Sequence, residues 1–360
     1  MQAIVLPGDD IVANETSLIH VLMRAPVADT CYLAVGSGTI TDIARFVSHR
    51  TRNRFISLPT APSMDGYATT NNTLTLGGFK LSTAAHAPEA IFCDLETLAT
   101  APRPMIAAGL GDTLAKFTSV NDLRLGHLLW DERWDEAIGQ RMEKLAKAAL
   151  ARAAEVARAD ADAVAFLTQA LIDSGLAMGA FGSSMPGGGA EHHISHCWEM
   201  RSLQQGSPTP LHGAKVGVGT VMAAGWYAGL RELGRVEAAR RLAGAATPGA
   251  GADAEEDAIR RTYGPVAGEI ITQQAQFIRM PGEEWSALKE RILGRWDEIQ
   301  AIAARVPPPE TIAAALRGAG GPGAPEELGL RAGEIVLAAR YGHYTRPRFT
   351  IAKLRLILGL

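Results

Sequence analysis

Residues that are far apart in this sequence have the side-chain types of a metal-binding site. Asp112 supplies a carboxylate, while His192 and His196 in one segment and His212 in another supply imidazoles. One carboxylate with two imidazoles is a ligand set that binds zinc or iron and leaves a coordination position open for substrate. A metal held in this way polarises a carbonyl or alcohol oxygen, so these residues predict an enzyme.

The spacing of the first two histidines favours a site. His192 and His196 are four residues apart, so on a helix they lie on one face, one turn apart. One of them would bind the metal while the other reaches the bound substrate. The alternative is that they are ordinary polar or core histidines, since four of the nine histidines lie between residues 192 and 212.

Composition argues against several classes of protein. A length of 360 residues predicts two domains, and a net charge of −3 without a basic block argues against a nucleic-acid partner. The three cysteines are far apart and odd in number, which favours a reducing cytoplasm over a disulfide framework. The N-terminus lacks a signal-peptide pattern, and no uncharged apolar run reaches the roughly 18 residues of a membrane helix. We therefore expect a soluble cytoplasmic protein.

The first 101 residues alternate short apolar runs with turns. Strands are expected at 3–6, 31–35, 55–58 and 90–93, and helices at 14–24 and 40–48. Strands that alternate with helices predict a parallel, Rossmann-like α/β sheet. This part of the chain, residues 1–101, is therefore expected to be a nucleotide-binding α/β domain.

From residue 102 onward the pattern is helical. Residues 244–253 and 318–325 are rich in Gly and Pro and are expected to be connectors. Residues 102–360 are thus predicted to form an all-helical domain that carries the metal-binding and catalytic residues. Its expected helices include 139–158, 162–179, 190–202, 212–233, 253–278, 282–304, 308–317 and 325–341.

An expected strand, a glycine turn and an expected helix follow one another at 35–42. Glycines such as Gly36 and Gly38 let a backbone approach a phosphate closely, and a helix N-terminus offers free N–H groups and a favourable dipole. The segment is neither a full GxGxxG motif nor a P-loop, so an ordinary strand-to-helix turn stays the alternative.

The loop at 59–67 follows the third expected strand. Loops at the carboxyl ends of parallel strands line the ligand crevice. Thr60 and Ser63 would donate to phosphate or ribose there, and Asp65 would accept from a substrate hydroxyl. The alternative is a capped turn in which Asp65 bonds to nearby backbone.

Five ordered segments together resemble a known family. In order and spacing across residues 30–220 they are similar to the sn-glycerol-1-phosphate dehydrogenases. That family belongs with the iron-containing alcohol dehydrogenases, the glycerol dehydrogenases and the dehydroquinate synthases. The segments are Gly36–Thr39, Pro59–Tyr67, Gly109–Asp112, Ala190–His196 and Leu211–Gly217.

The resemblance implies a dehydroquinate synthase-like fold and an NAD(P)-linked, Zn²⁺- or Fe²⁺-dependent reduction of dihydroxyacetone phosphate to sn-glycerol 1-phosphate. The metal would act as a Lewis acid on the ketone oxygen, held by Asp112, His192 and His212. Asp65 and His196 would contact this small-molecule substrate, with Asp112 beside it. A homo-oligomer is also expected. The residues that would line the cofactor are Gly36, Ser37, Gly38, Thr39, Ile40, Thr60, Ala61, Pro62, Ser63 and Thr69.

Two features depart from the family pattern. Only 35 residues precede Gly36, where the family usually has a longer segment that completes the cofactor domain. A missing strand would leave a bare sheet edge and exposed apolar surface, so we expect weakened stability unless another subunit covers the gap, and weakened cofactor binding. Met185 stands where the family often has an arginine, which pairs with a phosphate as a fork. Either the substrate is an unphosphorylated or differently placed polyol, or another cation such as Lys116 or Lys215 replaces that arginine.

Two other functions stay open at this point. A sugar-phosphate cyclase of the dehydroquinate synthase type, which is a lyase, is less favoured because those enzymes tend to have glutamate at the position of Asp112. A non-catalytic relative that keeps the metal site is favoured only by the short N-terminus. The sequence does not choose between zinc and iron, because an Asp/His/His set suits both, nor between NADH and NADPH.

Overall fold

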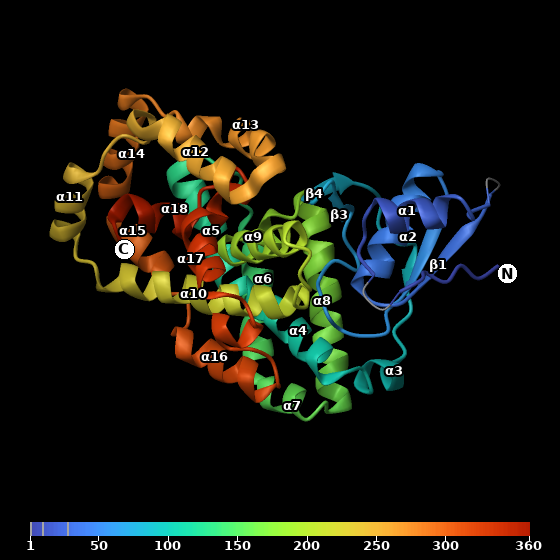
Figure 1. Ribbon diagram of the computed structural model, residues 1–360. Coiled ribbons are helices and arrows are strands. Elements are labelled where there is room, and N and C mark those ends of the chain that lie inside the picture. The colour runs from blue at the N-terminus through green and yellow to red at the C-terminus, as the bar shows by residue number, and fades with distance from the viewer. Residues whose placement is uncertain (1, 9–10, 27–28) are drawn as a thin grey trace.

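A small parallel sheet organises the N-terminal part of the computed structural model, which describes residues 2–8, 11–26 and 29–360 (Figure 1). Strand β1 (Cys31–Val35) pairs with β2 (Arg54–Leu58), and β2 pairs with β5 (Ala90–Ile91), in the order β1-β2-β5. Helix α2 (Gly38–Arg50) connects β1 with β2, as a parallel pair requires. The predicted parallel sheet and its strands at 31–35 and 55–58 are confirmed.

The other two predicted strands need correction. Residues 3–6 form no strand, because a strand needs a paired neighbour and the described part of the chain places none beside them. Leu6 instead packs on the apolar cluster that includes Leu18 of α1 (Glu15–Leu22) and Ile43 of α2. The strand expected at 90–93 pairs only through Ala90–Ile91, so Cys93 lies beyond its end.

An antiparallel hairpin that we did not predict separates β2 from β5. It consists of β3 (Asn71–Leu76) and β4 (Phe79–Ala84), joined by Gly77 and Gly78. Both glycines have positive φ, +56° and +78°, as a tight two-residue hairpin turn demands. The hairpin bears on the site because β4 carries Lys80 to Glu199 of helix α9 (Ala190–Gln204).

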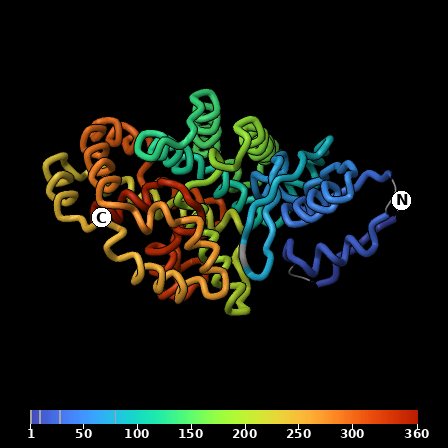
Figure 2. Tube along the Cα trace, turned by 90° about the horizontal axis from the view of Figure 1, so that it is seen from above, coloured from blue at the N-terminus to red at the C-terminus, as the bar shows by residue number. Residues whose placement is uncertain are grey.

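The rest of the chain is helical, and Figure 2 shows it at the opposite end of the molecule from the N-terminal segment. Most of the expected helices are confirmed, although 139–158, 253–278 and 282–304 each form two helices. The helix expected at 325–341 begins only at Ala332, after a 3-10 turn at Pro325–Leu328. Gly264, with φ +54°, and Pro265 end the first half of 253–278, because neither continues an α-helix well. The helices are α3 (Leu95–Ala99), α4 (Arg103–Leu114), α5 (Lys116–Trp130), α6 (Glu136–Ala151), α7 (Ala153–Ala157), α8 (Ala161–Phe181), α9 (Ala190–Gln204), α10 (His212–Glu232), α11 (Arg235–Gly244), α12 (Ala252–Tyr263), α13 (Ala267–Ile278), α14 (Gly282–Gly294), α15 (Trp296–Ala303), α16 (Pro309–Gly318), α17 (Ala332–Tyr341) and α18 (Ile351–Leu358), with 3-10 turns at Met185–Gly187, Pro248–Gly251, Gly264–Val266, Pro325–Leu328 and Gly342–Thr345.

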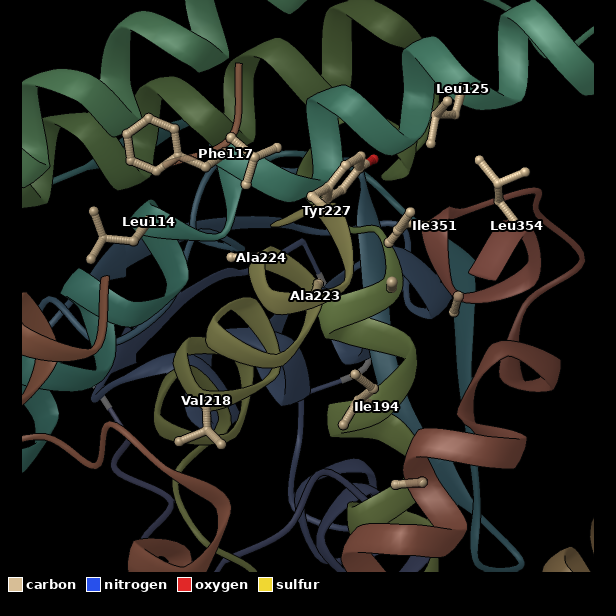
Figure 3. Packing of buried hydrophobic residues seen from close by; sticks show 14 of the residues in the cluster. Leu114, Phe117, Leu125, Ile194, Val218, Ala223, Ala224, Tyr227, Ile351 and Leu354 are labelled. Atoms are coloured by element: carbon tan, nitrogen blue, oxygen red, sulfur yellow. The ribbon is translucent and has the colours of Figure 1, made fainter. Parts of the chain in front are cut away.

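Helices α4, α9 and α10 meet in the main core. Figure 3 shows Ile194 of α9 and Val218 and Tyr227 of α10 among the packed apolar side chains. Helices α4 and α10 touch backbone to backbone: a Cβ added to Gly213 would lie 2.0 Å from the carbonyl oxygen of Ala108. This close approach brings the start of α10 against α4 at Ala108, one turn before Asp112.

Helix α8 is long and apolar enough to cross a membrane by length and composition. However, 56% of its most apolar window is buried inside the protein. A core helix of a soluble protein passes the same test, so this feature is weak evidence for a membrane segment.

Lys353 on α18 predicts a pH-dependent stability. Its side chain is buried, donates to Gln274 Oε1 at 2.9 Å and faces the ring of Phe277. Burial lowers the pKa of Lys353 to about 7, whereas the unfolded chain holds this proton to about pH 10. Between these values the unfolded state binds more protons, so stability rises with pH.

We therefore expect this lysine to add about 3 kcal/mol to the rise in the free energy of unfolding between pH 7 and pH 10. Chemical denaturation of the unsubstituted chain and of Lys353→Met across that range measures the contribution. The variant should show a flatter dependence. Equal slopes for the two chains would contradict the assignment.

Candidate active site

The three ligand-type side chains predicted from the sequence come from three helices and meet in one place. Asp112 lies on α4, His192 in the first turn of α9, and His212 at the start of α10. One potential ligand atom from each lies within 4.8 Å of the other two. His192 Nε2 is 3.5 Å from Asp112 Oδ1. This geometry fits a single metal ion bound between the helices.

Unpaired polar atoms in this cluster support the same fit. Asp112 Oδ1 and His212 Nδ1 are buried and have no hydrogen-bond partner among the described residues. A buried polar atom without a partner is costly, and a metal ion bound between these side chains would remove that cost. Burial also holds the pKa of His212 well below its ordinary value, so its imidazole is neutral and can act as a ligand at neutral pH.

Glu191 orients the first histidine. Its Oε1 lies 3.0 Å from His192 Nδ1, which leaves Nε2 of that ring facing Asp112. Thr118 Oγ1 donates to the other carboxylate oxygen at 2.6 Å. Burial alone would raise the pKa of Glu191, but the hydrogen bonds that its carboxylate makes with His192, Thr118 and the backbone of Gly189 hold it below its ordinary value. The carboxylate therefore stays charged and fixes the tautomer of His192.

The loop that follows β2 docks on α4 through Asp65. The backbone N–H of Asp65 donates to Asp112 Oδ2 at 2.9 Å. The carboxylate of Asp65 receives Lys116 Nζ at 2.7 Å and Ser174 Oγ at 2.8 Å. Burial and the charge of Asp65 raise the pKa of Asp112, and Lys116 opposes that rise. Lys116 therefore holds the two carboxylates side by side.

His196 lies beside the three-residue cluster without being part of it. Its ring centroid is 6.0 Å from that of His192 and 6.1 Å from that of His212. Burial, followed by the charges of Arg346 and Lys80, holds the pKa of His196 well below its ordinary value. The imidazole is therefore neutral at pH 7 and has a nitrogen available to accept a proton.

A cleft of about 710 Å³ lies between the N-terminal part and the helices, and it contains the histidine cluster. Of the ten predicted cofactor residues, Ser37, Gly38, Thr39, Ser63 and Thr69 line it. The N-terminus of α2, with Ser37 as its N-cap, thus borders the cleft, where a helix N-terminus attracts phosphate.

The other five predicted cofactor residues are not among those that line the cleft. The carbonyl of Gly36 accepts from the N–H of Thr60, and Ile40 packs against Gly36. The carbonyl of Ala61 accepts from Tyr67 Oη at 2.6 Å, and the carbonyl of Pro62 lies against α4. These contacts shape the two loops, so the geometry gives Gly36, Ile40, Thr60, Ala61 and Pro62 a supporting position rather than a place on the cleft wall.

Several charged residues of the cleft were not predicted. Arg346 and Arg348 follow the 3-10 turn Gly342–Thr345, far along the chain from the histidines, and both line the cleft. Arg348 Nη1 donates to the carbonyl of Met185 at 3.0 Å, so an arginine does reach the segment where the sequence lacks one. Lys80 and Glu199 also line the cleft. The sequence signal for the two arginines was their position on either side of Pro347, close to the C-terminus.

Comparisons with known proteins agree with this arrangement. Residues 10–102 match the family model of the iron-containing alcohol dehydrogenases. A glycerol-1-phosphate dehydrogenase (NAD(P)+) of Geobacillus thermodenitrificans is 32% identical over 345 residues, which are 96% of this chain and 76% of the relative. The enzyme of the same name from Geobacillus stearothermophilus is 33% identical over 343 residues, 95% of this chain and 75% of the relative.

A solved structure shares the fold. The iron-containing alcohol dehydrogenase of Corynebacterium glutamicum superposes with a TM-score of 0.53 at 16% identity, covering 95% of this chain and 77% of that one. At this identity the likeness bears on the fold alone. The predicted fold class, a parallel α/β sheet followed by a helical part, is confirmed.

Proposed function

This chain belongs to the glycerol-1-phosphate dehydrogenase family of the iron-containing alcohol dehydrogenases, and on that premise we propose that it reduces dihydroxyacetone phosphate to sn-glycerol 1-phosphate with NAD(P)H. One observation carries the proposal for this chain's own residues. The ligand atoms of Asp112, His192 and His212 converge within 4.8 Å at the cleft that the α2 N-terminus also borders.

The metal-binding residues fit the group that the family implies. Asp112, His192 and His212 would hold a zinc or iron ion, with Glu191 fixing the ring of His192. Bound there, the ion supplies a Lewis acid for the ketone oxygen of the substrate. The protein's part is to keep these ligands in place before substrate arrives, which the buried hydrogen bonds of Glu191 and Asp112 accomplish.

Two side chains would interact with the hydroxyl groups of the substrate. Asp65 lines the cleft with its carboxylate fixed by Lys116 and Ser174, so it is positioned to accept a hydrogen bond from a substrate hydroxyl. His196, neutral at pH 7, is positioned to exchange the proton of the secondary hydroxyl. The two residues thereby orient the three-carbon substrate between the metal ligands and the coenzyme.

The coenzyme fits the N-terminal wall of the cleft. Free N–H groups at the start of α2 are suited to its pyrophosphate, and Ser63 and Thr69 offer hydroxyls nearby. The nicotinamide supplies the hydride. The side chain of Ser37 makes no capping bond to the helix, so its hydroxyl is available to a ligand.

The test is oxidation of NADH and of NADPH by the purified chain, loaded with zinc or iron, in the presence of dihydroxyacetone phosphate. We expect turnover that stops when a chelator removes the metal and returns when the metal is restored. A chain that binds one ion yet oxidises neither coenzyme would overturn the proposal and would favour the non-catalytic relative. Formation of a cyclised sugar product without net coenzyme oxidation would favour the lyase.

A further inference from the structure

Two histidines of the N-terminal part meet outside the cleft. His49 lies in the last turn of α2, and His86 lies in the segment between β4 and β5. Their Nδ1 atoms are 3.4 Å apart, and their ring planes are inclined at 65° to each other. Neither residue is among those that line the cleft. The pair is therefore separate from the candidate active site.

Ser48 fixes the tautomer of the second histidine. Ser48 Oγ donates to the carbonyl oxygen of Arg45 at 3.0 Å, which uses the only proton of the hydroxyl group. The same oxygen lies 3.1 Å from His86 Nε2, so it accepts a hydrogen bond from that nitrogen. With its proton on Nε2, the neutral ring of His86 has a free electron pair on Nδ1, the atom that faces His49.

The ring of His86 is also held in place by packing. The buried ring of Phe55 on β2 lies against it, with the two ring centroids 5.6 Å apart. The N–H of Glu89 donates to the carbonyl oxygen of Phe55 at 2.9 Å, which ties the segment that carries His86 to the sheet. A hydrogen bond that orients an imidazole before a metal arrives is typical of a metal ligand.

The distance between the two nitrogen atoms fits one metal ion. Zinc binds imidazole nitrogen at about 2.0–2.1 Å with tetrahedral angles, so two nitrogens on one zinc ion lie about 3.3–3.4 Å apart. The Nδ1 atoms of His49 and His86 already have this separation. The position also favours a cation, because His49 lies at the C-terminal end of α2, where the helix dipole is negative.

We propose that His49 and His86 form a second metal site, which binds a divalent ion that prefers imidazole, such as zinc, through their Nδ1 atoms. His49 is exposed, so water molecules can complete the coordination. Among the described residues, only Asp112, His192 and His212 form a group of three potential metal-binding side chains. With two protein ligands, the second site should bind zinc more weakly than the first and lose it on dialysis.

An ion at this site would connect two segments of the N-terminal part. His49 belongs to α2, and His86 lies shortly before β5. Gly38, at the other end of α2, lines the cleft, and a helix rises about 16 Å from there to His49. An ion that binds only the folded chain stabilises it. The second ion should therefore stabilise the fold and take no part in the reaction.

The test is calorimetric titration of the chelator-treated protein with zinc. We expect zinc to bind at the candidate active site and, more weakly, at a second site. His49→Ala and His86→Ala should each lower the affinity of the second site at least about tenfold and leave the first ion and kcat/KM unchanged. His20→Ala, a change at a histidine of α1, is the matched control and should keep both ions.

Ser48→Ala tests the argument from the tautomer. The variant keeps both histidines but removes the oxygen that accepts from His86 Nε2. Loss of such an orienting partner typically costs about 10–100-fold in metal affinity, and we expect a loss in this range at the second site only. Unchanged zinc affinity in Ser48→Ala, His49→Ala and His86→Ala would overturn the proposal.

Thermal unfolding separates the site from ion binding to the unfolded chain. In His192→Ala, whose first site is impaired, zinc should still raise the unfolding temperature. Addition of His86→Ala to this variant should abolish that rise. A rise that persists in the double variant would overturn the proposal, because the stabilising ion would then bind elsewhere.

The outcome does not depend on the proposed function. If the unsubstituted chain binds a single zinc ion, the variants show which residues hold it. Loss in His49→Ala and His86→Ala, with retention in His192→Ala, supports the second site even where the dehydrogenase assignment fails. The reverse pattern overturns the second site and leaves the first in place.

Discussion

Replacement of His192 or His212 by alanine is expected to remove most of the bound metal and to lower kcat/KM by about 1,000-fold or more. In the proposed site each histidine would supply one of three protein ligands, whose potential donor atoms lie within 4.8 Å of one another. Loss of one ligand leaves a two-residue set that holds a zinc or iron ion poorly. Elemental analysis of the bound metal tests the expected loss of metal, and the rate of coenzyme oxidation tests the expected fall in kcat/KM.

His196→Ala is the matched comparison, because it removes the other histidine on the face of α9 that carries His192. Its ring lies about as far from His192 as from His212, outside the cluster of ligand atoms. The variant should therefore keep its metal and lose turnover. If His196→Ala loses the metal while His192→Ala keeps it, the roles of the two residues are exchanged.

The local part of the site was predictable because helix periodicity determines which side chains share a face. His192 and His196 were expected one turn apart, and the structure places both on α9 facing the cleft. Helix periodicity does not predict that these two histidines lie close to Asp112 and His212. That prediction depended on the order of five motifs that resemble a known family, since no local pattern indicates which helices touch.

The hairpin, the strand expected at 3–6 and the cleft cations Lys80 and Arg346 were missed or misassigned for different physical reasons. The hairpin carried a usable signal, a Gly77-Gly78 pair between strand-forming residues, which is typical of a two-residue turn. The strand expected at 3–6 failed because a short apolar run becomes a strand only when a neighbour pairs with it. Arg346 and Lys80 are separated in sequence from the histidines and approach them only through tertiary packing, so no spacing rule could have placed them.

The close contact between α4 and α10 brings Asp112 and His212, two of the proposed metal ligands, near each other, and it can be tested at Gly213. This residue follows His212 directly, and a Cβ added to it would lie 2.0 Å from the carbonyl oxygen of Ala108 on α4. Because that atom belongs to a helix backbone, it cannot move aside as a side-chain end can. Gly213→Ala should therefore push the helices apart.

Separation of the helices should have two measurable consequences. We expect the free energy of unfolding to fall by about 3 kcal/mol, at the upper end of the typical cost of overpacking. We also expect weaker metal binding, because Asp112 and His212 lie on the two helices that are forced apart. Chemical denaturation of the metal-free protein measures the first effect, and competition with a chelator measures the second.

Gly225→Ala provides the control on the same helix. Apart from its chain neighbours and the backbone of its own helix, no atom of the described residues lies within 4 Å of a Cβ added there. The substitution should therefore stabilise the protein by about 0.5–1 kcal/mol through helix propensity and leave metal affinity unchanged. If Gly213→Ala were as stable as Gly225→Ala, the backbone contact would not be tight. If it were destabilised yet bound metal normally, the ligand geometry would be set by the loops and by Glu191 rather than by the packing of α4 on α10.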